Sequence, residues 1–152
     1  MHGNGRNGRQ PNDFAGALAD RSGLLASYIA CMHRGALDFF TGGRVLLSSA
    51  IDRHHILPRS QFTEKDRSKA DNIANIAFIS GDVNKAIGQS GPEVYLKRIK
   101  KQVLQSQCVP TETAFWTIDN AEEFWEARRK LLAESFNEFL RGALPQRKVA
   151  TS

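Results

Sequence analysis

Cysteine is scarce in this 152-residue chain, which has only Cys31 and Cys108, far apart and without the spacing of a metal site. A dense disulfide framework is therefore excluded, and we expect two free thiols in a reducing cytoplasm. Histidine is scarce too. Beyond the adjacent pair His54 and His55 there is no close set of Cys and His, which argues against a structural zinc module.

Long apolar runs are also absent. No stretch reaches 18 apolar residues, so we expect no membrane span. The first ten residues have no apolar core, so we expect no secretion signal there. We interpret residues 1–12 as a flexible leader and residues 145–152 as a disordered basic tail. Residues 13–144 then form one domain, long enough to bury a core without disulfides.

The chain has an excess of positive charge. It carries 21 Lys and Arg against 16 Asp and Glu, a formal net charge of +5. Positive charge permits binding to nucleic acid, but many basic domains bind none. Composition therefore leaves the partner open.

Apolar spacing predicts helices at both ends of the chain. From Asp13 to Phe40 the spacing is helical, with glycines as breaks, and indicates a scaffold helix or helix pair. A further helix begins with Pro92 at its first position. The last opens with Asp119 and Glu122, spaced as a capping box, and its apolar stripe continues to Leu140. We expect an α+β fold that is mostly helical.

The middle of the chain predicts two strands. Val45 begins an extended segment, and the first strand should end near His55, because Pro58 cannot donate to a ladder. Residues 59–71 are polar and predict a long exposed loop. Residues Ile73–Ile79 form the second predicted strand.

A short helix should follow that strand. Ser80 is a suitable N-cap, Asp82 lies in the first turn, and Gly88 stops the helix. This order of strand, strand and helix would bring Asn84 toward the histidine pair.

The histidine pair suits phosphodiester hydrolysis. That reaction needs a barrier reduction of about 20 kcal/mol. A metal can polarise the phosphate while a neutral imidazole takes a proton from the attacking water. We assign His55 as the general base, because the unperturbed pKa of histidine lies near working pH. We assign His54 and Asn84 as metal ligands.

Two further residues would support this site. Asp52 lies two residues before His54, so both face the same side of a strand, and Asp52 could orient a ligand. Asn75 could tie the long loop's backbone and hold His55 in position. Mg²⁺ or Mn²⁺ suits such a half-empty, oxygen-rich site, although Zn²⁺ or Ni²⁺ could occupy it. Adjacent strand residues point to opposite faces, so the strand must bend, bulge or end near His55.

The residues His54-His55-Ile56-Leu57-Pro58, followed by Asn75, Asn84, Pro92 and Tyr95, resemble the ββα-metal, or HNH, nuclease site. They are most similar to the C-terminal nuclease domain of modification-dependent restriction and phosphorothioate-dependent DNA-defence proteins. The likeness covers roughly residues 13–100. It implies a ββα-metal motif embedded in flanking helices and a DNA endonuclease or nickase in antiphage defence.

The chain departs from that family in two ways. The family's N-terminal, NTP-using, ParB-like sensor has no counterpart in this sequence, so modification sensing and nucleotide hydrolysis are not carried over. The chain could be an excised C-terminal domain, with the sensor domain or a defence-system partner outside it, or a stand-alone nuclease. The family often has Asp-His where this chain has His54-His55, which leaves the metal preference open.

DNA contact is expected from basic side chains near the site, and a contribution from Lys97–Lys101 is left open. Together they would give salt-dependent, sequence-tolerant phosphate binding. The residues near the site are Arg59, Lys65, Arg67, Lys69 and Lys85. An alternative from another class is a catalytically inactive nucleic-acid-binding module with the same fold.

Overall fold

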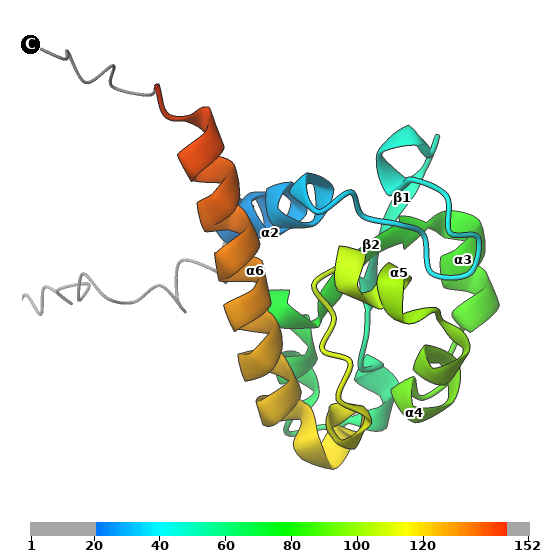
Figure 1. The fold of residues 1–152 in the computed structure, drawn as a ribbon. Helices are drawn as coiled ribbons and strands as arrows, with labels where there is room; N and C mark the ends of the chain where they lie inside the picture. Colours follow the sequence, from blue (N-terminus) through cyan, green and yellow to red (C-terminus); the bar gives the residue numbers. More distant parts are fainter. Residues whose placement is uncertain (1–20, 146–152) are drawn as a thin grey trace, which may run out of the picture.

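The computed structural model describes residues 21–145. The predicted leader, the predicted helical residues before Arg21 and the tail from residue 146 lie outside the described residues. The described part is α+β, with helices around one two-stranded antiparallel sheet (Figure 1). Its helices and strands are α2 (Arg21–His33), β1 (Ile51–His55), β2 (Ile76–Ser80), α3 (Gly81–Ile87), α4 (Pro92–Tyr95), α5 (Lys101–Ser106) and α6 (Ala121–Ala143).

The sheet pairs β1 with β2 so that His54 lies opposite Ala77 and His55 opposite Ile76. The predicted end of the first strand near His55 is confirmed. The predicted start of the second strand is wrong. The Asn72 side chain accepts a hydrogen bond from the backbone N–H of Ala74, which holds Ile73–Asn75 in a 3-10 turn before β2 begins.

Side chains pair with the outer edge of β2, the edge that faces away from β1. The backbone N–H of Phe78 donates to Gln107 Oε1, and Gln107 Nε2 donates back to the carbonyl of Phe78. The backbone N–H of Ser80 donates to Asp38 Oδ1 at 3.0 Å. The polar groups of this edge are thereby satisfied, and the small sheet is covered on that side.

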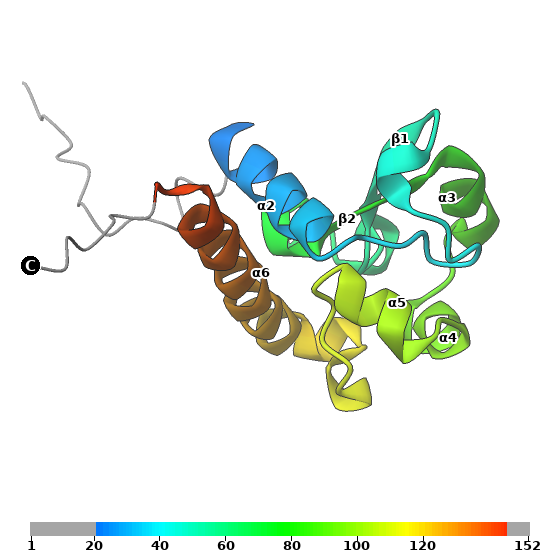
Figure 2. The same cartoon turned by 45° about the horizontal axis from the view of Figure 1, so that its top comes forward.

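The long helix α6 lies beside α2 on one flank of the molecule, while β1, α3 and α4 lie on the other (Figures 1 and 2). Its buried residues Phe124 and Trp125 belong to the main core, where the Trp125 ring stacks on Phe62 at 5.8 Å between centroids. Leu132 belongs to a second cluster that includes Ala30 of α2. The helix α6 therefore contributes to both the main core and the cluster beside α2.

The structure corrects several predicted elements. The first helix ends at His33, short of Phe40, and the predicted break at a glycine is confirmed at Gly35, which takes a φ of +70° where the chain turns. The segment Val45–Leu47 is a 3-10 turn and not extended. The helix at Pro92 lasts one turn, and a new helix begins at Lys101.

The caps give a mixed outcome. Ser80 caps α3 as predicted, accepting from the backbone N–H of Val83, and Gly88, with φ +56°, ends that helix. The capping box is wrong. Asp119 lies inside a 3-10 turn capped by Thr117, and α6 begins after it.

Both cysteines are free, as predicted, and the structure buries both of them. None of the helices found in residues 21–145 has the length and apolar character needed to cross a membrane.

Candidate functional site

An open cleft of about 570 Å³ lies at the end of β1, beside α3. His54, His55 and Asn84 all line it. Two adjacent histidines can share one cleft because β1 ends at His55. The other lining residues are Arg53, Pro58, Arg59, Ser60, Arg67, Gly88 and Gln89.

His54 and Asn84 meet directly. Nδ1 of His54 lies 2.9 Å from Oδ1 of Asn84. The amide orientation of Asn84 follows from its other contact, because Nδ2 donates to Asp52 Oδ2 at 3.1 Å. Asp52 therefore orients Asn84, one of the two predicted metal ligands.

The imidazole of His54 is neutral at neutral pH. The pKa of His54 is lowered to about 4, chiefly by burial and to a smaller extent by electrostatic interaction with His55 and Arg128, while the hydrogen bond that the charged ring would make to Asn84 acts in the opposite direction. A neutral imidazole has one nitrogen with a free lone pair, which is the form that binds metal ions.

His55 has a partner that the sequence did not suggest. Its Nε2 lies 3.0 Å from Oδ1 of Asp71, and Arg59 approaches the same oxygen at 3.5 Å. The His55 side chain is 33% exposed, so solvent reaches the ring. Asp71 is the last residue of the polar loop predicted for residues 59–71. Its position just before the second predicted strand was the only signal in the sequence that it could lie near the site.

Asn75 is fully buried and does not line the cleft. Its Oδ1 accepts from the backbone N–H of Leu57 at 2.9 Å, and its Nδ2 donates to the carbonyls of Leu57 and Ala70. Asn75 thus ties the turn after His55 to the end of the long loop. Its side chain holds the loop backbone, and these hydrogen bonds go to Leu57 and Ala70 rather than to either histidine.

The predicted DNA-binding residues divide into two groups. Arg59 and Arg67 line the cleft. Lys65 and Lys85 are exposed but do not line it, and the ammonium of Lys69 pairs with Asp66 at 3.0 Å. Arg53, which sequence reasoning did not select, also lines the cleft. Its position next to the histidine pair was the available signal.

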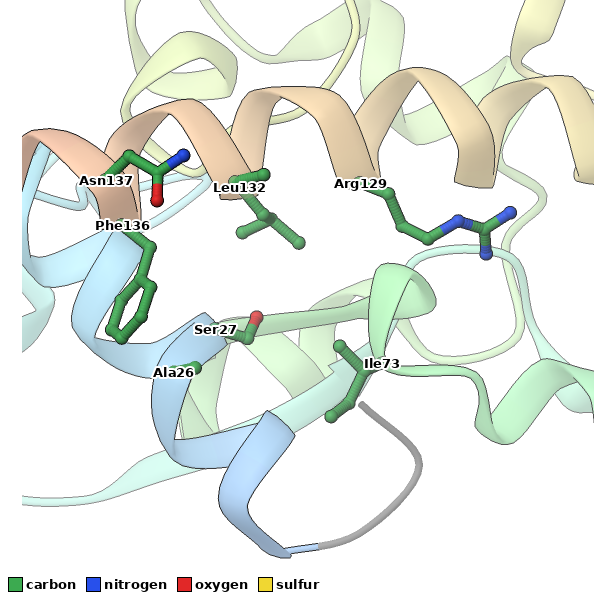
Figure 3. Close-up of a pocket in the computed structure, with 8 residues that line it drawn as sticks. Ala26, Ser27, Ile73, Arg129, Leu132, Phe136 and Asn137 are labelled. Carbon is green, nitrogen blue, oxygen red and sulfur yellow. The ribbon is translucent and has the colours of Figure 1, made fainter. Parts of the chain in front are cut away.

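A second pocket, of about 310 Å³, lies between α2 and α6 (Figure 3). Its wall is mainly apolar and includes Ile73, Leu132 and Phe136. It contains none of the predicted site residues. The predicted residues His54, His55 and Asn84 therefore line the cleft at the end of β1 and not this pocket.

Within residues 21–145, no three side chains of the His, Cys, Asp and Glu types gather as a metal-binding group. The candidate ligands in the cleft are one imidazole and one amide oxygen, with the Asp52 carboxylate behind the amide. No protein-family model, curated protein or solved structure matches the chain.

Proposed function

We propose that the chain is a metal-dependent DNA endonuclease or nickase with a ββα-metal site. His54 and Asn84 would hold the divalent cation, and His55 is the general base. The observation that most supports this proposal is the convergence of these three side chains, from β1 and α3, on one open cleft. The likeness to nuclease domains of DNA-defence proteins adds a role in restriction to the proposal.

The donor atoms fit a divalent cation. The 2.9 Å between His54 Nδ1 and Asn84 Oδ1 is close to the ~3.0 Å between neighbouring ligands of an octahedral ion with bonds of ~2.1 Å. Two protein ligands leave positions for water and phosphate oxygens, which suits Mn²⁺ or Mg²⁺, and an imidazole ligand also accepts Zn²⁺ or Ni²⁺. The ion would polarise the scissile phosphate and stabilise the leaving oxygen.

The contact between His55 and Asp71 supports the role of general base that we propose for His55. The Asp71 carboxylate accepts from Nε2–H of His55, so a neutral ring keeps its lone pair on Nδ1. Nδ1 is then the atom that takes the proton from the attacking water. The negative charge of Asp71 stabilises the imidazolium that results, in the way that a carboxylate supports a catalytic histidine in hydrolases.

The cleft suits a phosphate backbone. Arg53, Arg59 and Arg67 line it and supply planar donors that bind phosphate oxygens. Such contacts position a nucleic acid without reading its sequence. We therefore propose that binding is salt-dependent and tolerant of sequence.

A plasmid assay tests this proposal. Supercoiled plasmid should be nicked or linearised with Mn²⁺ or Mg²⁺, and both EDTA and His55→Ala should abolish the reaction. His33→Ala is the matched control, because His33 lies at the end of α2 beside Glu138, outside the cleft. Unchanged cleavage by His55→Ala would refute the base assignment. DNA binding without cleavage under any divalent ion would select the inactive binding module instead.

A further inference from the structure

The two ring nitrogens of His54 have different partners. Nδ1 faces Oδ1 of Asn84, and Nε2 lies 3.0 Å from the hydroxyl of Tyr95. His54 is 4% exposed and Tyr95 1% exposed, so water does not substitute for either partner. The position of the single proton of the neutral ring is therefore decided inside the protein.

The hydroxyl of Tyr95 favours one of the two positions. This hydroxyl has one proton, and it donates that proton to the carbonyl oxygen of Ile56 at 2.7 Å. A carbonyl oxygen can only accept, so toward His54 the hydroxyl is left as an acceptor. A hydrogen bond between His54 and this hydroxyl then needs the ring proton on Nε2, which leaves the free lone pair on Nδ1.

The atom that Asn84 presents to His54 is also set by a neighbouring hydrogen bond. Asn84 uses Nδ2 to donate to Asp52, so the atom that it presents to His54 is the acceptor Oδ1. With the ring proton on Nδ1, the ring donates to Oδ1 and leaves Nε2 facing the Tyr95 oxygen without a proton; with the ring proton on Nε2, two acceptors face each other at 2.9 Å. This arrangement is unfavourable by itself and becomes favourable when a cation lies within reach of both lone pairs.

We propose that Tyr95 is a positioning residue of the cation site, which fixes Nε2–H of His54 and thereby makes Nδ1 the ligand atom. The inference rests on the proposed function, since it takes His54 as a ligand. Ligand histidines generally donate their second ring N–H to an acceptor that sets ring orientation and basicity. Here that acceptor is a buried phenol whose own proton is already committed.

Packing keeps the ring in this orientation. The rings of Phe39 and Tyr95 meet the His54 ring nearly edge to face, with centroids at 6.0 and 5.5 Å. Phe39 offers no hydrogen-bond acceptor. Without the Tyr95 hydroxyl, the ring proton would move to Nδ1, which would donate a hydrogen bond to Asn84 Oδ1. A cation would have to break this hydrogen bond before it could bind both ligand atoms.

The tautomer can be observed directly in metal-free protein. A long-range ¹H–¹⁵N correlation spectrum at neutral pH should show His54 protonated on Nε2 and bare on Nδ1. In Tyr95→Phe the proton should move to Nδ1, and the Kd for Mn²⁺, measured by calorimetry, should rise about tenfold or more. Tyr28→Phe is the matched control. It removes the hydroxyl of the chain's other tyrosine, on α2, and should change neither result.

Two results would overturn the inference. One is a wild-type spectrum with the proton on Nδ1, which decides the matter even if Tyr95→Phe does not fold. The other is a folded Tyr95→Phe protein with unchanged Mn²⁺ affinity. A protein with bare Nδ1 that binds Mn²⁺ but leaves plasmid intact would support Tyr95 and refute the nuclease. Cleavage by a protein with protonated Nδ1 would do the reverse.

Discussion

Arg128 donates hydrogen bonds to the backbone on both sides of Asn75. From α6, its fully buried guanidinium donates to the carbonyl oxygens of Ala74 at 2.9 Å and Ile76 at 2.7 Å. It also donates to the carbonyl of Gln107 at 3.1 Å. Asn75 in turn holds the backbone of Leu57, two residues after His55. A helix remote in sequence thus supports the turn that ends β1 at the cleft.

Replacing Arg128 should therefore damage the fold before it affects chemistry. Arg128→Met leaves several buried carbonyls without donors, and we expect the free energy of unfolding to fall by about 3 kcal/mol. Urea denaturation measures this change. Arg129→Met, one residue along α6 and partly exposed, is the control and should stay within about 0.5 kcal/mol of wild type. Equal stability of the two variants would contradict the role given to Arg128.

Local features of the site were predictable, and distant partners were not. Pro58 set the end of β1, and Ser80 and Gly88 set the bounds of α3, because turn and cap preferences act within a few residues. These features placed His54 and Asn84 near one another. Tyr95 and Asp71 received no role, since meeting a histidine across 41 or 16 residues depends on how the whole chain packs.

The errors in the helices have the same origin. Residues 92–104 have helical spacing, yet Ile99 is extended, with ψ of 134°, and the chain divides there into short helices. Leu96 and Ile99 are both buried across this break. Tertiary packing that buries both residues therefore outweighs the helical preference that spacing alone predicted.

The low pKa of His54 predicts a loss of stability in acid. Because burial lowers the pKa of His54 from 6.5 to about 4, the unfolded chain binds more protons between these values. Stability should then fall as pH drops from about 6.5 toward 4, by about 3 kcal/mol in full.

His54→Gln, which cannot titrate, isolates this effect. Urea unfolding at several pH values should show a shallower acid slope for the variant than for wild type. Carboxylates contribute to both slopes and cancel in the difference. Identical slopes would mean that His54 is not held neutral by the fold.

Asp71 should matter for cleavage through His55. Asp71→Asn keeps the size of the side chain but removes the carboxylate that accepts from His55 Nε2, so the ring loses its preferred tautomer. We expect the single-turnover nicking rate to fall by roughly 10²-fold with DNA affinity little changed. Asp66→Asn is the control on the same loop, because Asp66 pairs with Lys69 and not with a histidine. A similar loss in both variants would point to loop damage instead.

The cleft arginines predict a salt dependence that can be counted. Arg67 lines the cleft, whereas Lys130 lies on α6, where its ammonium pairs with Glu126 at 3.6 Å. If Arg67 contacts one phosphate, Arg67→Ala should weaken binding to any DNA sequence and reduce the slope of log K against log salt by about 1. Lys130→Ala should leave that slope unchanged. Fluorescence anisotropy with duplexes of unrelated sequence, in EDTA to prevent cleavage, measures both quantities. Equal slopes for wild type and Arg67→Ala would show that Arg67 contacts no phosphate and would contradict DNA binding in this cleft, because each neutralised phosphate releases counterions and so changes the slope.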